Sequence, residues 1–382
     1  MSELSFSLGT FQGITDAPFR NVFKQHFSGI DKFFTPFFTG IHKEEHAKNL
    51  QGEEIDPRCN DVETLTPQIL STDAEEILRF AKQCRQLGYK EINLNMGCPF
   101  PRVANKKRGC GLLPYPDNVE AMLDRVFEEI DIKFSIKCRL GYFNPEEIDA
   151  IIPVFNKFRL SELIIHPRIG KQLYKGEADV ERFKAIIPLI NAPLVYNGDI
   201  VSVESFERIR GIIESLSCGG LRVKPAMTPI EETSPKSVIA GKDPQSPELK
   251  GYMLGLGILA NPFLAEDIKA SFNARPHSVK TENNEAIQKG NSPDCFVPIN
   301  DVPDDKINRL HNYILDLYEN RLHHAGGSPK VLGRMKELWS YLMYSFDEPQ
   351  DIWRKIKKIN ALKDYEEAVE TIFRSHTLRI IT

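Results

Sequence analysis

Residues Glu91–Leu113 read EINLNMGCPFPRVANKKRGCGLL, and this stretch decides the fold. It begins with a short apolar run, Glu91–Asn95, whose composition is typical of a buried strand. It then continues into a loop rich in glycine and basic residues. Helix-like segments lie on either side, at Asp73–Leu87 and Pro116–Glu129. A strand between two helices is the repeating unit of a parallel α/β fold.

The same unit recurs before and after this stretch, between Leu4 and Pro262, with further helix-like segments at Pro145–Phe158 and Ser202–Ile213. Eight such units predict an α/β fold, the (β/α)8 TIM barrel, in which chemistry takes place at the carboxyl ends of the strands. The predicted strands are Phe6–Gly9, Lys32–Thr35, Thr64–Ile69, Glu91–Asn95, Phe134–Lys137, Glu162–Ile165, Pro193–Tyr196 and Tyr252–Gly255.

A polar segment rich in Pro and Asn, residues 273–305, is typical of a linker and separates two regions of different pattern. We expect the barrel over residues 1–272, with a surface insertion at 221–249 where Pro, Ser and charged residues gather. Residues 306–382 have apolar residues at helical spacing and predict a small all-α domain of three or four helices. This domain has thirteen Lys and Arg against ten Asp and Glu, although the whole chain has a net charge of −4. Its positive charge suits a polyanion; the alternative is an ordinary solvated helix face.

Composition places the chain among soluble globular proteins, because 41% of its 382 residues are hydrophobic and 27% are charged. Its seven cysteines are scattered without a C-x-x-C spacing, which argues against a disulfide framework or a zinc site and favours a reducing cytoplasm. The first residues do not resemble a secretory signal, and no apolar run approaches the ~20 residues of a membrane span. We therefore expect a cytoplasmic protein without a membrane segment or a bound metal.

Cys98 is the strongest candidate for a catalytic residue. It follows the carboxyl end of a predicted barrel strand, where a thiol can act as a nucleophile or as a proton donor if its surroundings adjust its pKa. A buried, inert thiol is the alternative.

The segment Asn95-Met96-Gly97-Cys98-Pro99 resembles the marker of the tRNA-dihydrouridine synthase family, and Gly109–Leu113 is similar to the Gly-x-x-Leu-Leu that follows it. Gly333–Leu342 extends the resemblance into the helical domain, where it is nearest to the bacterial C-type subfamily. Further motifs of the family occur in the family's order: Gly13–Arg20, Pro67-Gln68, Ile136–Gly141, His166-x-Arg168, Gln172-x-Tyr174-x-Gly176 and Asn197-Gly198-Asp199.

The resemblance implies bound FMN, which needs an anchored phosphate and a ring edge turned toward the substrate. In barrels the loops after the seventh and eighth strands commonly hold phosphate. Here their glycines, in Asn197-Gly198-Asp199 and Gly255-Leu256-Gly257, let backbone N–H groups approach a phosphate closely. Lys137, at a strand end, is suited to stabilise negative charge on a reduced flavin. The predicted cofactor residues are Thr10, Phe11, Gln68, Lys137, His166, Arg168, Asn197, Gly198, Asp199, Gly255 and Leu256.

Two departures from the family concern this flavin site. The chain has Gly9-Thr10-Phe11 where members usually have Ala-Pro-Met, and Gly255-Leu256 where they usually have Gly-Arg. Because the arginine is an expected phosphate partner, either FMN binds more weakly or a cation of the insertion, Arg222 or Lys224, takes its place.

The reaction implied by the resemblance is the reduction of uridine in tRNA to 5,6-dihydrouridine by NADPH, with FMN passing hydride to uracil C6 and Cys98 protonating C5. Asn95, Arg139 and Tyr174 are the predicted substrate contacts. The uracil must leave its stack to enter the barrel, while the helical domain and Asn105–Arg108 contact the RNA backbone. We expect no stable protein partner. Two alternatives stay open: an FMN barrel that reduces a small metabolite, and a non-catalytic tRNA-binding protein.

Overall fold

The computed structural model describes residues 4–48, 52, 54–215, 249–274, 304–324 and 327–379. Most of the predicted insertion (221–249) and linker (273–305) lies outside these residues, as do Arg222 and Lys224. The exact domain boundaries therefore stay a prediction. Within the described ranges, no helix has the combination of length and apolar character needed to cross a membrane.

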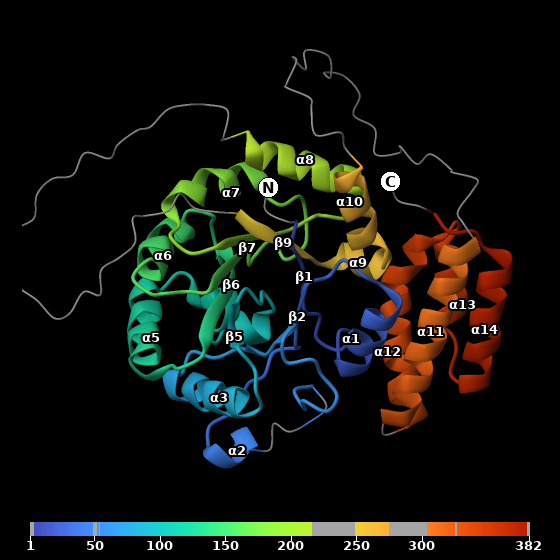
Figure 1. Cartoon of the computed structure of the whole chain (residues 1–382), viewed down its shortest axis with the longest axis horizontal. Helices are drawn as coiled ribbons and strands as arrows, with labels where there is room; N and C mark the ends of the chain where they lie inside the picture. The colour runs from blue at the N-terminus through green and yellow to red at the C-terminus, as the bar shows by residue number, and fades with distance from the viewer. Residues whose placement is uncertain are drawn as a thin grey trace, which may run out of the picture.

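Parallel strands form a ring at the centre of the molecule (Figure 1). Their order in the sheet is β3-β2-β1-β9-β8-β7-β6-β5-β4. The strands are β1 (Phe6–Leu8), β2 (Lys32–Phe34), β3 (Leu65–Thr66), β4 (Gln68–Ile69), β5 (Glu91–Met96), β6 (Lys133–Gly141), β7 (Glu162–Ile169), β8 (Leu194–Asn197) and β9 (Leu249–Leu254).

The two strands at the ends of this order, β3 and β4, are parts of one extended segment that is divided at Pro67. Proline has no N–H to donate to a ladder, but the Pro67 carbonyl accepts a hydrogen bond from the Asn93 amide at 2.9 Å. The ring therefore closes through Pro67, and the predicted barrel of eight strand segments is confirmed.

Helices cover the outside of the ring (Figure 1). Local signals in the sequence start several of them: the Asp73 carboxylate accepts from the Glu75 amide at 2.9 Å, and Ser202 and Ser205 form a reciprocal capping box. These helices are α1 (Ala17–His26), α2 (Glu44–Lys48), α3 (Ala74–Gln86), α4 (Pro101–Ala104), α5 (Pro116–Glu129), α6 (Glu147–Phe155), α7 (Val180–Ile186), α8 (Val203–Glu214), α9 (Leu256–Ala260) and α10 (Leu264–Asn273), with 3-10 turns η1 (Gly109–Leu112) and η2 (Ile187–Leu189).

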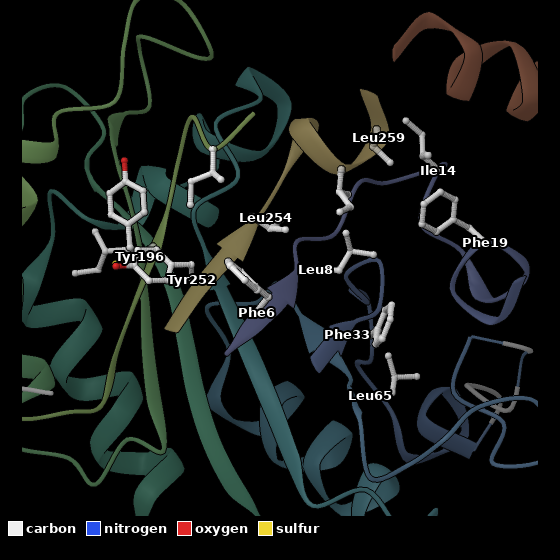
Figure 2. Close-up of a cluster of buried hydrophobic side chains, with 14 of the residues drawn as sticks. Phe6, Leu8, Ile14, Phe19, Phe33, Leu65, Tyr196, Tyr252, Leu254 and Leu259 are labelled. Carbon is white, nitrogen blue, oxygen red and sulfur yellow. The ribbon is translucent and has the colours of Figure 1, made fainter. Parts of the chain in front are cut away.

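Apolar side chains of the strands fill the space between the ring and its helices. Figure 2 shows Phe6 of β1 between the tyrosines Tyr196 and Tyr252 and the side chains Leu8 and Leu254. All five are buried, with at most 4% of their surface exposed. Since each such side chain contributes about 1.5–3 kcal/mol when removed from water, this layer holds the strand ends in place.

The C-terminal region contains four α-helices among the described residues, in agreement with the predicted all-α domain. They are α11 (Asp304–His324), α12 (Ser328–Leu342), α13 (Pro349–Ile356) and α14 (Leu362–Ser375), with the 3-10 turn η3 (Met343–Ser345) after α12. They lie at one side of the barrel, where α11 contacts α1 and α12 contacts α9 (Figure 1). Trp339 of α12 is fully buried and its indole N–H donates to the Tyr365 hydroxyl at 2.9 Å.

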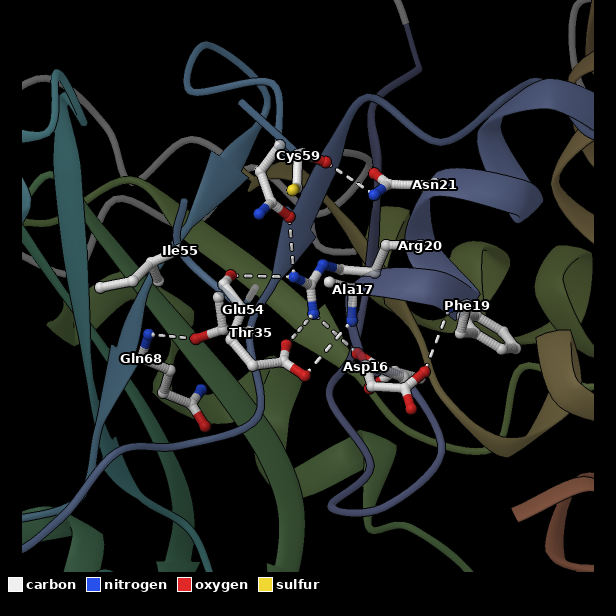
Figure 3. Close-up of polar contacts among 12 residues, drawn as sticks. Asp16, Ala17, Phe19, Arg20, Asn21, Thr35, Glu54, Ile55, Cys59 and Gln68 are labelled. Carbon is white, nitrogen blue, oxygen red and sulfur yellow. Dashed lines mark hydrogen bonds and ion pairs between the residues drawn. The ribbon is translucent and has the colours of Figure 1, made fainter. Parts of the chain in front are cut away.

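The junction between these helices and the barrel is built on Asp16. Its carboxylate caps α1 by accepting from the Phe19 amide at 3.1 Å, and it also binds Arg334 and the buried Arg321, the latter at 3.1 Å. Beside it, Arg20 donates to the Glu54 carboxylate at 2.8 Å (Figure 3). The motif Gly13–Arg20 thus attaches the helical domain to the first barrel unit, a structural role that the sequence did not reveal.

Candidate active site

A cavity of about 150 Å³ opens at the carboxyl ends of the strands. Ten of the predicted cofactor or substrate residues line it, so the structure brings together motifs that are far apart in the chain. The lining consists of Gly9, Thr10, Phe11, Lys137, His166, Tyr174, Asn197, Gly198, Asp199, Ile200, Val201, Gly255, Leu256 and Gly257.

Lys137 of β6 places a cation against this cavity. Among the described residues, no carboxylate pairs with it. Burial and, secondarily, the neighbouring Arg139 lower the pKa of Lys137 to about 8. The ammonium is therefore still charged at neutral pH, and an electron-rich or anionic group in the cavity would stabilise it.

His166 of β7 also lines the cavity and is 9% exposed. Burial first, and then the positive charges of Lys137, Arg139 and Arg168, lower the pKa of His166 well below its usual range. The imidazole is therefore neutral at pH 7 and can both donate and accept a hydrogen bond.

The backbone of the turn after β8 has a glycine where a ligand could approach it closely. A side chain at Gly198, whose φ is +158°, would come within 3.1 Å of the Ala178 Cβ and 3.2 Å of the Tyr196 hydroxyl. Asp199, with φ of +46°, has a left-handed conformation. The Asn197 side-chain amide holds this turn to β9 by donating to the Met253 carbonyl at 2.9 Å.

Arg168 does not line the cavity. It is buried behind Asp199, to which it donates two hydrogen bonds of 2.7 Å, and it also donates to the Lys175 carbonyl at 2.8 Å. The Asp199 carboxylate is further held by the Ala178 amide at 2.6 Å. Arg168 thus neutralises Asp199 and fixes its turn; the predicted direct contact between Arg168 and a cofactor stays a prediction.

Gln68 lies deeper, inside the barrel. It is fully buried, donates to Asn93 at 2.9 Å and accepts from the Asn95 side chain at 2.8 Å. The Asn95 carboxamide oxygen in turn accepts from the amides of Gly97 and Cys98, at 3.0 and 2.9 Å. In the structure this row of amides shapes the turn before the cysteine, and the predicted cofactor and substrate contacts of Gln68 and Asn95 stay predictions.

Cys98 follows β5 and is 8% exposed. Burial raises the pKa of its thiol, and the Phe100 amide and the cations Arg139, Arg102 and Lys137 only partly offset this effect. The thiol is therefore protonated at neutral pH, which suits a proton donor better than a nucleophile.

Cys110 lies in the same loop and is buried against the backbone of Cys98. Its amide and its thiol both donate to the Cys98 carbonyl, at 3.2 and 3.3 Å, and it is completely buried. Burial raises the pKa of Cys110 to about 12. Gly109, with φ of +57°, allows this approach because a Cβ there would lie 2.6 Å from the Cys98 carbonyl oxygen. Cys110 is a structural thiol that supports Cys98.

Arg139 and Tyr174 occupy the neighbouring edge of the site. Arg139 is buried and donates to the carbonyls of Ile169 and Leu173, at 2.9 and 2.7 Å. Its guanidinium lies 5.3 Å from the centre of the Tyr174 ring, which is half exposed and lines the cavity. Tyr174 is therefore accessible to a ligand, whereas Arg139 mainly holds the loop that carries it.

The sequence did not single out Ile200 and Val201 as site residues, although it placed Gly257 in the predicted phosphate loop. The first two directly follow the Asn197-Gly198-Asp199 motif, so its continuation along the chain was the available signal. Gly257 contacts this segment closely, since a Cβ there would lie 2.2 Å from the Ile200 carbonyl oxygen. The loops after β8 and β9 therefore form one continuous floor.

The cavity has the chemistry that the flavin ring of FMN requires. Lys137 and His166 provide a cation and a neutral imidazole for a polar ring edge, and Phe11 and Leu256 provide apolar surface. The buried Thr10 hydroxyl makes no hydrogen bond with any described residue, which leaves it available to a ligand. The residues present therefore fit the cofactor.

Comparison with known proteins gives a consistent picture. The family model for dihydrouridine synthase (Dus) matches residues 8–244. The chain is 29% identical over 200 residues to tRNA-dihydrouridine synthase B of Pasteurella multocida (strain Pm70), covering 52% of this chain and 58% of that protein. It is 27% identical over 217 residues to the synthase B of Vibrio cholerae, covering 56% and 65%, and 30% identical over 190 residues to that of Escherichia coli (strain K12), covering 49% and 58%.

The chain thus spans less than two thirds of the length of these relatives. All three are named synthase B, whereas the motif Gly333–Leu342 predicts a similarity to the C-type subfamily. The family model ends at residue 244, before that motif begins. The resemblance of the helical domain to the C-type subfamily therefore stays a prediction.

Proposed function

Because the chain belongs to the dihydrouridine synthase family, we propose that it reduces uridine in tRNA to 5,6-dihydrouridine, with FMN as bound cofactor and NADPH as reductant. The observation that carries this proposal is the position of Cys98, a protonated thiol on the loop next to a cavity that contains Lys137 and His166. The family match supports the reaction class, and the groups that line the cavity support placing the chemistry there.

FMN would lie in this cavity, with Thr10, Phe11, Lys137 and His166 around its ring system and the turn at Gly198 near its phosphate. When bound, FMN would supply two-electron redox chemistry that couples the oxidation of NADPH to the reduction of the uracil C5–C6 bond. Lys137 favours negative charge at the ring edge, and the neutral His166 orients a polar atom without adding charge. Leu256 offers no charge to the phosphate, and the candidates Arg222 and Lys224 lie outside the described residues.

Cys98 would complete the reduction by donating its thiol proton to C5 of uracil, and a proton from solvent would restore the thiol. The raised pKa supports this role because the proton is present at neutral pH. Tyr174, half exposed at the cavity edge, would contact the uracil from the side opposite the barrel wall. Arg139 positions Tyr174 through its contact with that ring.

The partner would be tRNA, encountered in the cytoplasm. A uracil in folded tRNA is covered by its neighbours, so it must be extruded into the cavity at a cost of a few kcal/mol that contacts with the protein offset. The helical domain, with its net positive charge, and the loop Asn105–Arg108 would bind the RNA backbone.

The proposal is tested with purified protein and with tRNA from a strain that lacks this gene. We expect a yellow protein with flavin absorbance that introduces dihydrouridine into this tRNA when NADPH is added, at a position that sequencing of the modified tRNA identifies. A yellow protein that neither binds nor reduces tRNA would instead be a reductase of small metabolites. A colourless protein that binds tRNA would be a non-catalytic RNA-binding protein.

A further inference from the structure

Two phenylalanines beside the candidate active site are unusually exposed. Phe100 is 53% exposed and Phe143 is 54% exposed, more than any other large hydrophobic residue among those that the structure describes. Phe100 lies two residues after Cys98, and Phe143 lies two residues after the end of β6, the strand that pairs with β5. Because parallel neighbours end on the same side of a sheet, both residues lie at the carboxyl end of the barrel. We call Phe100 and Phe143 the aromatic rim.

The backbone under each ring is fixed. The Glu147 carboxylate accepts hydrogen bonds from the amides of Tyr142, Phe143 and Asn144, at 2.7, 3.0 and 3.2 Å. The Phe143 ring also meets the Tyr142 ring edge-on, with centres 4.6 Å apart. The rim is therefore not formed by side chains of a loose loop, and a ligand that covers Phe143 would pay little entropy to order it.

Phe100 is held in a comparable way. Its carbonyl accepts from the amides of Val103 and Ala104, at 2.8 and 2.9 Å, and Pro101 follows it. The loops of the two phenylalanines are joined where the Tyr142 hydroxyl donates to the Asn105 side chain at 3.4 Å. The loop that carries Phe100 and the loop that carries Phe143 are therefore in contact.

Basic residues lie on the same loops as these two phenylalanines. The loop 99–113 has four basic residues and no Asp or Glu. The Lys171 ammonium lies 5.5 Å from the centre of the Phe143 ring and 5.0 Å from that of Tyr142. Within the described part of the chain, no carboxylate forms an ion pair with any of the following cations: Arg102, Lys106, Lys107, Arg108, Lys171 and Lys175.

We propose that the aromatic rim stacks against the bases that flank the target uridine once that uridine has been extruded. This inference rests on the proposed function and identifies the form of RNA that the enzyme holds: a locally unpaired, single-stranded segment. Extruding one base removes a stacking partner from each neighbour, and rigid aromatic faces replace it. Exposed rings among unpaired cations match a polyanion with planar bases and do not match the apolar surface of a protein.

The test is the affinity and turnover of the full-length enzyme with unmodified tRNA. Phe100→Ala and Phe143→Ala should each weaken tRNA binding about tenfold, which equals ~1.4 kcal/mol at 25 °C. The KM for tRNA should rise while kcat changes little, because stacking of the flanking bases holds substrate and transition state alike. Phe100→Trp and Phe143→Trp should retain wild-type binding, since Trp keeps a planar aromatic face.

Salt dependence separates stacking from charge. The slope of log affinity against log salt should be unchanged in both Phe variants, whereas Lys106→Ala should reduce it by about 0.7, the value for one phosphate contact on a single strand. Leu189→Ala is the matched control, because Leu189 is 52% exposed but precedes β8 at the other end of the barrel. Circular dichroism establishes that each variant is folded.

If both Phe variants bind tRNA as tightly as the unsubstituted enzyme does, the stacking inference is overturned. The proposed function still stands in that case, provided that the unsubstituted enzyme reduces tRNA. Conversion of a dimer to a monomer by the same substitutions, with unchanged tRNA affinity, would identify the rim as a protein interface and equally overturn it. Failure of the wild type to form dihydrouridine would refute the proposed function itself, which distinguishes the two.

Discussion

The two ends of the barrel differ in how charge is balanced. At the amino ends of the strands, Lys32 lies 2.9 Å from Glu91 and 3.2 Å from Glu162, and Lys250 lies 3.4 Å from Glu162. At the carboxyl ends, Lys137 faces the cavity without a carboxylate partner among the described residues. The same residue type therefore serves two purposes: paired charges close one end, and an unpaired charge prepares the other end for a ligand.

The pKa values follow this division. Burial alone would lower the pKa of Lys32, but the carboxylates of Glu162 and Glu91 outweigh burial and raise it. Burial of Lys137 has no such compensation, and the pKa falls to about 8. The carboxyl end thus has a destabilised cation that an anionic group would stabilise, which is a physical reason to place the cofactor there.

The largest effect should come from removing the ion pairs of Lys32 at the amino ends of the strands. Lys32→Ala leaves Glu91 and Glu162 partly buried without their shared cation, and we expect the free energy of unfolding to fall by about 3 kcal/mol. Urea unfolding followed by circular dichroism measures this. Lys250→Ala is the control, because Lys250 is largely exposed and its pair should contribute less than about 1 kcal/mol. Equal losses in both variants would contradict the distinction between a buried and an exposed pair.

The second-largest effect is expected at Cys98, at the carboxyl end of the barrel. Cys98→Ala should leave flavin binding and NADPH oxidation nearly intact while tRNA reduction falls by about two orders of magnitude or more, because the proton donor to C5 is lost. Single-turnover assays of reduced enzyme with tRNA measure this step. Cys110→Ala, in the same loop, is the control. An inactive Cys110→Ala beside a normal Cys98→Ala would mean that the acid has been assigned to the wrong cysteine.

A smaller effect is expected at Leu256. If the phosphate of FMN lacks a cation, Leu256→Arg should tighten FMN binding about tenfold or more, since a charge-assisted hydrogen bond contributes about 1.5–3 kcal/mol. If Arg222 already supplies that charge, Arg222→Ala should weaken binding and Leu256→Arg should gain nothing. Flavin fluorescence titrations give the dissociation constants. If neither substitution alters the dissociation constant of FMN, the phosphate does not bind at the loop Gly255–Gly257.

The smallest effect concerns pH. With a pKa of about 8, Lys137 is mostly charged at pH 7 and mostly neutral at pH 9, so FMN affinity should fall by up to about tenfold over this interval. The phosphate stays ionised throughout, because its second pKa is about 6. Lys137→Met should bind FMN more weakly and show no such dependence. A wild-type profile that is flat from pH 7 to pH 9 would exclude Lys137 as a contact of the flavin.

Raising the pH should increase the free energy of unfolding of the flavin-free protein, although it weakens FMN binding. Because the pKa of Lys137 in the folded state lies below its ordinary value of 10.5, the unfolded chain binds more protons between pH 8 and pH 10.5. The cost of burying the ammonium is fully present below pH 8 and disappears as the pH rises toward 10.5. This contribution is absent in Lys137→Met, which serves as its comparison.

Sequence patterns predicted the strands well, including the segment Thr64–Ile69, because apolar runs between helices record which backbone is buried. What they could not predict was the break at Pro67, where the ring closes. The missing N–H of proline was visible, but whether a neighbouring strand needed that donor depends on register, which only the folded sheet defines.

The candidate site shows the same limit. Motif spacing located Lys137, His166 and the turn at Gly198 at strand ends, and the structure places all three at one cavity. It did not distinguish them from Arg168 and Gln68, which the structure places behind the cavity surface. Residues that contact a ligand and residues that hold those contacts occur in the same motifs, so the motif alone does not separate them.

By itself the sequence determined the barrel, its family and the cysteine on which the proposed chemistry depends, because each is written in contiguous residues whose pattern reflects local backbone geometry. Tertiary structure decided which polar side chains are already satisfied by the protein and which remain available. Arg168 is paired with Asp199, Asn95 with the turn before Cys98, and Lys137 with no described carboxylate. Availability depends on distances between residues far apart in the chain, and those distances arise only when the ring of strands closes.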